Sequence, residues 1–127
     1  MAPELAERFD APILLHPDDE VLWKQTHPSV DYTPLTDDQR ITVAGTEIQV
    51  IHTPGHSPGS VCSGDTLFQG GPGATGRSYS DFPTIIDSIR SLLLTLPAQT
   101  VVHTGHGDDT TIGAEAPHLA DWIAHGS

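Results

Sequence analysis

Basic residues are scarce in this sequence. Five Lys and Arg stand against 17 Asp and Glu in 127 residues, so the formal net charge at pH 7 is −12. Proteins that bind nucleic acids or anionic membranes draw much of their affinity from clustered Lys and Arg. With so few basic side chains, scattered along the chain, we expect neither a nucleic acid nor a membrane as partner.

Cysteine and long apolar runs are also nearly absent. The single cysteine, Cys62, excludes an intrachain disulfide framework and a cysteine-rich zinc site. The longest apolar runs, such as 13–15 and 92–94, are too short to span a bilayer, and the N-terminus lacks the pattern of a secretory signal. We therefore expect a cytoplasmic protein, and a length of 127 residues favours one domain over 1–127.

Apolar residues are arranged in alternating strand and helix patterns. Residues 81–96 carry the clearest helical stripe, which Pro97 ends. Residues 41–50 alternate with a period of two around Ala44-Gly45-Thr46, which predicts a β-hairpin. The other patterns predict helices over 3–9, over 17–24 and up to Gly126, strands over 13–15, 66–68 and 101–102, and loops over 26–39, 53–59, 70–77 and 104–109. The alternation is typical of the α/β class.

Histidine, in contrast, is abundant, with eight in the chain. Four of them lie where a predicted strand passes into a loop, and Asp65 lies at a similar place. Loops at strand ends collect functional groups in α/β proteins, and imidazole with carboxylate is a normal ligand set for zinc or iron. The four are His52, His56, His103 and His106.

The alternative for each histidine is an ordinary structural or solvated side chain. We expect that role for the four histidines away from strand ends, which are His16, His27, His118 and His125. His52 and His103 fit equally well as hydrogen-bonded strand-end residues. Spacing alone does not decide for a metal, because no pair of histidines on one helix forces it.

Three motifs point to a known family. They are His52-Thr-Pro-Gly-His-Ser-Pro-Gly-Ser60, Ser63-Gly-Asp-Thr-Leu-Phe68 and Val102-His-Thr-Gly-His-Gly107. Because it carries these three motifs in this order, the sequence resembles the metallo-β-lactamase-fold superfamily, nearest to its glyoxalase II-like hydrolases. The resemblance runs from Ala2 to Trp122. It implies an α/β fold, a partial αββα sandwich that corresponds mainly to the second half of the family fold.

The resemblance also implies a metal site. His56, Asp65 and His106 match metal ligands of the family, and Asp65 has a catalytic role there because it matches the carboxylate that bridges two metals. His52 and His103 are possible auxiliary ligands. The expected cofactor is zinc, with iron as the other possibility.

The sequence departs from the family in two places. The His-x-His-x-Asp-His motif that family members carry ahead of the first helix does not occur in these residues, and the segment between Cys62 and Ser63 is shorter than usual. We therefore expect at most one metal per chain. Missing strands would leave open sheet edges and apolar faces, so we also expect a homo-oligomer.

The glycine-rich segment 71–78 is a competing site. It differs from a phosphate-binding loop mainly by Arg77 in place of lysine, and the helix after it starts late, so a nucleotide site is disfavoured. In the hydrolase interpretation Arg77 would bind a substrate carboxylate with its two-pronged guanidinium, although a surface loop without a role is an equal alternative.

Two functions follow from these observations. The first is a metal-dependent hydrolase of a small-molecule ester, thioester or lactone, with weak activity because the metal site is incomplete. The alternative is a truncated or degenerate member without catalytic activity, which acts as a binding or assembly protein or as a fragment.

Overall fold

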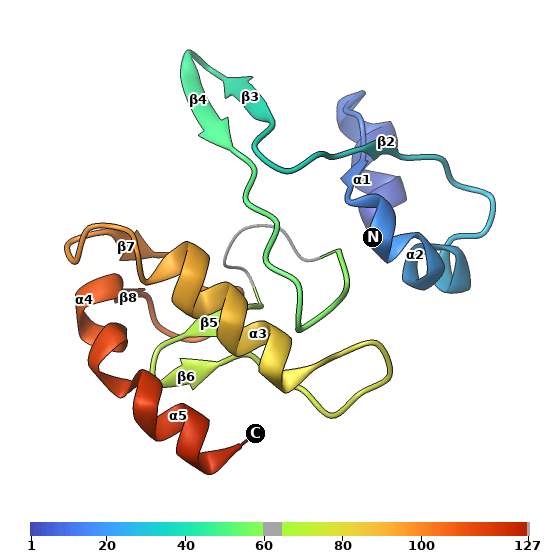
Figure 1. The fold of residues 1–127 in the computed structure, drawn as a ribbon. Helices are drawn as coiled ribbons and strands as arrows, with labels where there is room; N and C mark the ends of the chain where they lie inside the picture. Colours follow the sequence, from blue (N-terminus) through green and yellow to red (C-terminus); the bar gives the residue numbers. More distant parts are fainter. Residues whose placement is uncertain (60–64, 127) are drawn as a thin grey trace. The chain divides into compact units, whose positions relative to one another are not determined.

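The computed structural model describes residues 1–59 and 65–126, which form two compact units, Met1–Val50 (unit 1) and Ile51–Ser127 (unit 2) (Figure 1). The expectations for Cys62, for the shortened segment beside it and for Ser63-Gly64 lie outside the described residues. The elements of unit 1 are α1 (Ala2–Phe9), β1 (Leu14–Leu15), the 3-10 helix η1 (Pro17–Asp19), α2 (Glu20–Thr26), β2 (Thr33–Pro34), β3 (Arg40–Val43) and β4 (Thr46–Gln49).

Unit 1 begins with the predicted helix. Proline in the first turn of α1 costs no hydrogen bond, and Asp10 ends the helix with a left-handed backbone at φ 48°. Strand β1 pairs in parallel with β2, with Leu14 opposite Thr33. The prediction of a continuous loop over 26–39 is therefore wrong at β2. Its sequence gave no strand signal because Pro34 has no N–H to donate to a ladder.

The predicted hairpin is confirmed. Strands β3 and β4 are antiparallel, with Ile41 opposite Ile48. The turn between them has positive φ at both Ala44 (50°) and Gly45 (80°), which suits the twist of a two-residue hairpin. Two of the alternating apolar residues, Val43 and Ile48, are exposed.

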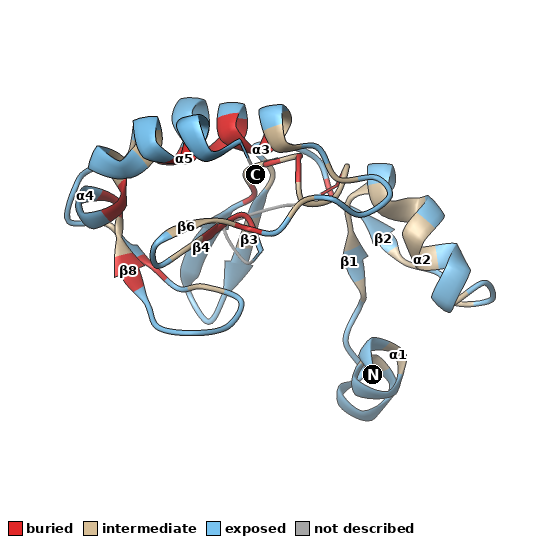
Figure 2. Cartoon of the chain, turned by 90° about the horizontal axis from the view of Figure 1, so that it is seen from below, coloured by how far each residue is buried: buried red, intermediate tan, exposed pale blue. Residues whose placement is uncertain are grey.

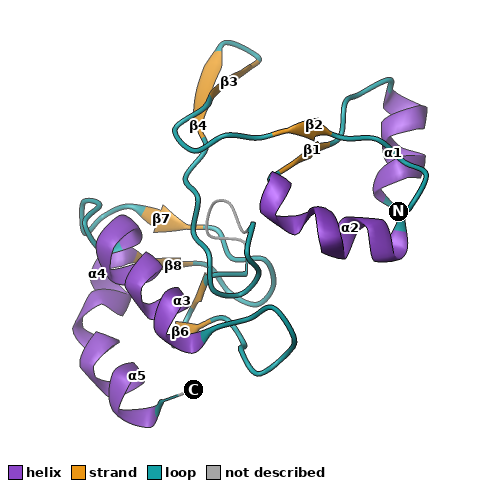
Figure 3. Ribbon diagram, turned by 45° about the vertical axis from the view of Figure 1, so that its right-hand side comes forward, coloured by secondary structure: helices purple, strands orange, loops and turns teal. Residues whose placement is uncertain are grey.

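Unit 2 contains β5 (Leu67–Phe68), β6 (Gly71–Pro72), α3 (Phe82–Ser88), the π-helical segment η2 (Ile89–Leu93), β7 (Val101–Val102), β8 (Thr110–Thr111), α4 (Ile112–Glu115), the 3-10 helix η3 (Ala116–His118) and α5 (Leu119–His125) (Figure 3). The pairs β5–β6 and β7–β8 are both antiparallel. Two of these strands lie in segments predicted as loop or left without prediction, because β6 is glycine and proline and β8 is two threonines.

The core of unit 2 forms around the predicted helical stripe. Ile85, Ile86, Ile89 and Leu93 are buried, and they pack with a residue from each neighbouring element: Leu67, Val102, Ile112 and Trp122. In Figure 2 these buried positions are red, whereas α1 and α2 of unit 1 are blue and tan. The side chain of Asp81 caps α3 by accepting a hydrogen bond from the backbone N–H of Thr84 at 3.0 Å. The α/β class is confirmed.

Over the described residues, no helix combines the length and apolar character needed to cross a membrane.

Candidate metal centre

The loop that carries His56 is fixed against the first turns of α3. Gly55 has φ +133°, and a Cβ on it would lie 2.4 Å from the Cα of Ile85, so no other residue fits. The backbone N–H of Asp81 donates to the carbonyl of Gly55 at 2.7 Å, and the hydroxyl of Ser88 donates to the carbonyl of Pro54 at 2.7 Å. The Pro-Gly pair before His56 therefore fixes the backbone position from which the His56 side chain extends.

The hydrogen bond of the His56 ring decides which nitrogen is free. Nδ1 lies 2.9 Å from the carbonyl oxygen of Ala74. Because a carbonyl only accepts, Nδ1 carries the proton, and in the neutral ring Nε2 keeps its lone pair. That Nε2 atom is 4.0 Å from Oδ2 of Asp65, with the two side chains 35% and 53% exposed. The separation is too long for a hydrogen bond, and in the neutral ring the lone pair of Nε2 can bind a metal ion beside the carboxylate.

Asp65 is held by the residues that follow it. The hydroxyl of buried Thr66 lies 3.1 Å from that of Thr53, which joins the start of β5 to the start of the His56 loop. The N–H of Gly73 donates to the carbonyl of Thr66 at 2.9 Å. A Cβ on Gly73 would lie 1.9 Å from the carbonyl oxygen of Asp65, so this position also requires glycine.

His106 lies in the loop between β7 and β8. The hydroxyl of Thr104 donates to the carbonyl of His106 at 2.7 Å and to that of Asp108 at 3.3 Å, which closes the loop on itself. The ring of His106 lies on that of Phe68, with centroids 4.3 Å apart and planes tilted by 31°. Phe68 ends β5, the strand that follows Asp65. This contact joins the His106 loop to the Asp65 strand.

The structure thus brings His56 and Asp65 together and holds His106 through a neighbour of Asp65. Among the described residues, the ligand atoms of His56, Asp65 and His106 do not all lie within 4.8 Å of one another. The donor set fits a divalent metal ion. A lone pair on Nε2 and a carboxylate oxygen 4.0 Å apart lie within reach of two metal–ligand bonds of about 2.0–2.2 Å. At metal sites, a ligating histidine usually donates the N–H of its other ring nitrogen to a carbonyl or carboxylate, as His56 does to Ala74.

The two possible auxiliary ligands have structural contacts. His52 has Nε2 at 2.8 Å from the carbonyl of Pro58, a bond across the loop that carries His56. His103 has Nδ1 at 2.8 Å from Oδ2 of Asp109, across the loop that carries His106, and its side chain is well exposed. Both histidines therefore brace a loop that holds a predicted ligand.

Arg77 follows the glycine-rich loop in a tight turn. The hydroxyl of Ser80 accepts the N–H groups of Gly76 and Arg77, each at 3.0 Å, and donates to the carbonyl of Arg77 at 2.8 Å. In the part of the chain that the structure describes, the Arg77 guanidinium has no carboxylate partner. Lys24, Arg40 and Arg90, in contrast, pair with carboxylates at 3.2, 2.9 and 2.7 Å. The Arg77 side chain is therefore available to an anion.

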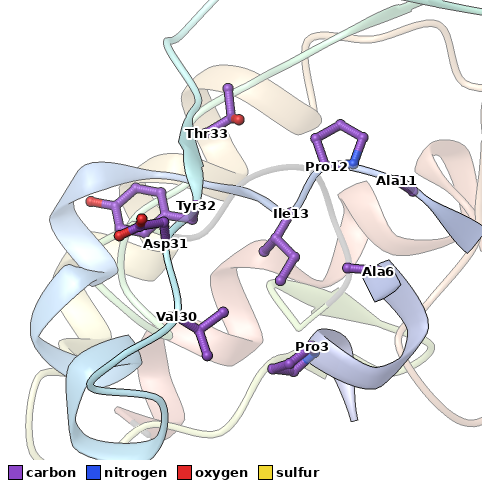
Figure 4. Close-up of a pocket in the computed structure, with 9 residues that line it drawn as sticks. All are labelled: Pro3, Ala6, Ala11, Pro12, Ile13, Val30, Asp31, Tyr32 and Thr33. Carbon is purple, nitrogen blue, oxygen red and sulfur yellow. The ribbon is translucent and has the colours of Figure 1, made fainter. Parts of the chain in front are cut away.

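A pocket of about 370 Å³ lies in unit 1 and holds none of the predicted ligands (Figure 4). Its lining is mainly apolar, with Ala6, Ile13 and Val30, and it also includes Asp31 and Tyr32. Partial burial raises the pKa of Tyr32, and the nearby Glu20 carboxylate raises it further. The pocket lacks the imidazole and carboxylate pair found in unit 2.

Several residues that shape the site were not predicted from the sequence. Phe68 was assigned to a strand, but its contact with His106 depends on two loops that are distant in sequence. The carbonyl of Ala74 accepts the hydrogen bond of His56 Nδ1 and so determines which ring nitrogen carries the proton. It is a backbone group without any sequence signal. The hydroxyl of Ser88 could not be recognised, because a serine inside a helix usually faces solvent or its own backbone.

The chain belongs to the metallo-β-lactamase superfamily. The family model described as "Metallo-beta-lactamase superfamily" matches residues 2–106. The probable metallo-hydrolase YqgX of Bacillus subtilis is 33% identical over 137 aligned positions, which cover 88% of this chain and 64% of that protein. The hydroxyacylglutathione hydrolase GloC of Haemophilus influenzae is 41% identical over 81 positions, 56% of this chain and 38% of that protein.

A solved structure agrees with the sequence comparisons. TTHA1623, crystallised in a di-iron-bound form, superimposes with a TM-score of 0.78 and 34% identity over 90% of this chain and 66% of that one. The family is one of metal-binding hydrolases, and its fold is confirmed for this chain. The chain spans between 38% and 66% of the length of these three proteins.

Proposed function

We propose that the chain is a metal-dependent hydrolase of small-molecule esters, thioesters or lactones, with weak activity and at most one metal per chain. The metal is zinc or, alternatively, iron, held by His56, Asp65 and His106. The observation that supports this most directly is the His56–Asp65 pair, in which Nε2 of the imidazole and a carboxylate oxygen lie 4.0 Å apart while Nδ1 is bonded to a carbonyl. A cation between them would satisfy both.

When bound, a divalent metal would acidify a water molecule and polarise the substrate carbonyl. The residues of the chain have separate tasks around it. His56 is kept in the tautomer that leaves Nε2 free, because Nδ1 donates to Ala74. Asp65 places Oδ2 4.0 Å from Nε2 of His56, and its carboxylate would accept the proton of the attacking water. The water oxygen adds to the acyl carbon, the bond to the leaving group breaks, and the proton passes to that group.

Arg77 supports a substrate with a carboxylate. Its exposed guanidinium has no carboxylate partner among the described residues and would bind two carboxylate oxygens side by side. The relative GloC is named for hydroxyacylglutathione, a thioester whose thiol portion carries carboxylates. An acylglutathione is therefore the first substrate to test, and Arg77→Lys the first specificity variant. Lysine keeps the charge but loses the two-pronged geometry.

We also propose that residues 1–127 act as one domain, in the cytoplasm and as a homo-oligomer. The family match over residues 2–106 supports one domain, because it includes parts of both units. Exposed apolar side chains of unit 1, such as Met1, Leu5 and Phe9, support association. Light scattering should give a mass above 13.5 kDa. A stable monomer would contradict this part of the proposal.

The test of the site is metal content with matched variants. Protein purified without chelators should hold up to one equivalent of zinc or iron, and His56→Ala and Asp65→Ala should lose it. His27→Ala is the control, because His27 contacts Trp23 in unit 1 and should leave the metal content unchanged. Two equivalents per chain, or full retention in Asp65→Ala, would contradict the proposed ligand set.

Turnover separates the two candidate functions. We expect slow hydrolysis of acylglutathiones and activated esters, well below the rate of about 10 per second that is typical of enzymes. Chelator and His56→Ala should abolish it. His106 is exposed, and its ring nitrogens do not lie together with the ligand atoms of His56 and Asp65. This favours a non-catalytic binding protein as the second candidate. Metal binding without any turnover would support that candidate.

A further inference from the structure

We propose that Glu115 is a positioning residue that holds two of the three proposed metal ligands in register; this inference rests on the proposed function. Glu115 ends α4, and it is 3% exposed. A carboxylate so deeply buried needs hydrogen-bond donors around it. The donors of Glu115 come from two segments that are far apart in the sequence.

The first donor belongs to the segment that carries Asp65. The backbone N–H of Gly70 lies 3.2 Å from Oε1 and 3.1 Å from Oε2 of Glu115. Gly70 forms the turn between β5 and β6, and β5 continues directly from Asp65 and Thr66. A fixed turn therefore fixes the strand that begins at Asp65 and ends at Phe68.

The second donor belongs to the segment that carries His106. The hydroxyl of buried Thr110 donates to Oε1 of Glu115 at 2.6 Å. Thr110 starts β8 opposite Val102, and this pair closes the loop that carries His106. Both ends of the Phe68–His106 contact are thus attached to one carboxylate, the first through Gly70 and the second through Thr110.

Hydrogen bonds to a charged acceptor are about twice as strong as those between neutral groups, so this carboxylate can hold both segments firmly. The His106 ring is exposed and has its loop as its main support, together with Phe68. Loss of the Thr110 donor would let the two segments move separately. The distance from His106 to the His56–Asp65 pair would then vary, and the free-energy cost of bringing the three ligands to one metal ion would rise.

The experiment compares two substitutions of Thr110 in the full chain. Thr110→Val keeps the shape and removes the hydroxyl, whereas Thr110→Ser keeps the hydroxyl. Leu93→Ala is the stability control, because it weakens the core of unit 2 and leaves the hydrogen bonds of Gly70 and Thr110 to Glu115 in place. Zinc affinity, measured by competition with a chelator, should fall about 10- to 100-fold in Thr110→Val and stay within about twofold in the other two. Equal affinities for the Val and Ser variants, or an equal loss in Leu93→Ala, would overturn the proposal.

A second measurement needs no metal. In the metal-free chain, the nuclear Overhauser contact between the rings of Phe68 and His106 should persist in Thr110→Ser and disappear in Thr110→Val and in Glu115→Leu, which removes both acceptor oxygens. Slow amide exchange at Gly70 should be lost in Glu115→Leu. If the wild type binds no zinc, the proposed function fails, and these signals still decide the role of Glu115. Unchanged ring contacts in all three variants would overturn it.

Discussion

The two units differ in what keeps their elements in place. Of the buried apolar residues that the structure describes, Leu35 and Val50 belong to unit 1, and eight belong to the cluster of unit 2. Unit 1 instead relies on local contacts, such as the Trp23 Nε1–H bond to the carbonyl of Val30 at 2.8 Å and the Arg40–Glu47 ion pair at 2.9 Å. An exposed ion pair such as Arg40–Glu47 contributes less than about 1 kcal/mol.

The proposed metal centre lies in the unit that has the core. Each proposed ligand is attached to that core through its backbone: His56 through Gly55 against Ile85, Asp65 through Thr66 and Leu67, and His106 through the strand that ends at Val102. A site made of loops needs such support, because ligand distances must be kept within tenths of an ångström. The difference between the units can be tested with matched substitutions.

The largest effect is expected for Gly55→Ala compared with Gly45→Ala. In unit 2 the new Cβ would meet the Ile85 backbone at 2.4 Å on a chain with φ +133°. Backbone strain and overpacking, each of about 1–3 kcal/mol, should together cost about 2–6 kcal/mol. Gly45 in unit 1 has φ +80° but open space around it, so strain alone should cost about 1–2 kcal/mol. Urea unfolding measures the free energy of unfolding of both variants. Equal losses of stability would show that the Gly55 loop moves away from α3 at little cost.

The next effect is expected for Ile89→Ala compared with Ile48→Ala. Ile89 is fully buried in the core cluster, so the cavity should lower the free energy of unfolding by about 2–5 kcal/mol. Ile48 faces Ile41 across the hairpin but is 45% exposed, and its loss should cost about 0.5 kcal/mol. Chemical denaturation of both variants tests this. A similar cost for Ile48 would show that a partner covers the hairpin in solution.

A smaller effect is expected at the N-terminus of α3. Asp81 accepts hydrogen bonds from the N–H and the hydroxyl of Thr84, and its own N–H donates to Gly55. Asp81→Ala should lower the melting temperature by an amount equivalent to about 1 kcal/mol. Asp81→Asn keeps an acceptor of similar capping strength and should lose much less. Thermal unfolding of the two variants would contradict the capping role if both losses were the same.

Part of the fold could be predicted from local patterns. The stripe from Ile85 to Leu93 follows from burial of one helix face, whereas the hairpin was found from its alternation and its Ala44-Gly45 turn, although Val43 and Ile48 are exposed. Strands β2, β6 and β8 were missed because they consist of Thr-Pro, Gly-Pro and Thr-Thr and carry no apolar pattern. The equally short strands β1, β5 and β7 are apolar and were predicted. The three motifs gave the ligand candidates through family resemblance. The roles of Phe68, Thr110 and Glu115 could not be predicted, because each depends on contacts between distant segments.

The smallest effect is expected in unit 1, at Tyr32. Partial burial raises the pKa of this phenol above its ordinary value of 10.0, and the Glu20 carboxylate adds charge repulsion and a hydrogen bond that also raise it. The folded chain therefore keeps this proton at a pH where the unfolded chain has lost it. The unfolded chain binds fewer protons above about pH 10, so stability is present below that pH and is lost as the pH rises through the folded pKa.

Phenolate absorbance measures this titration. In a Tyr79→Phe background, Tyr32 is the remaining tyrosine, and its midpoint should lie above 10.0. Glu20→Gln should bring the midpoint down toward that value, because the carboxylate charge is gone, while partial burial still holds it above. Lys24→Gln should move it the other way, since the Lys24 charge lowers the pKa of Tyr32. A midpoint that neither variant moves would show that Tyr32 and α2 separate in solution, and unit 1 would then be even less constrained than its few buried residues indicate.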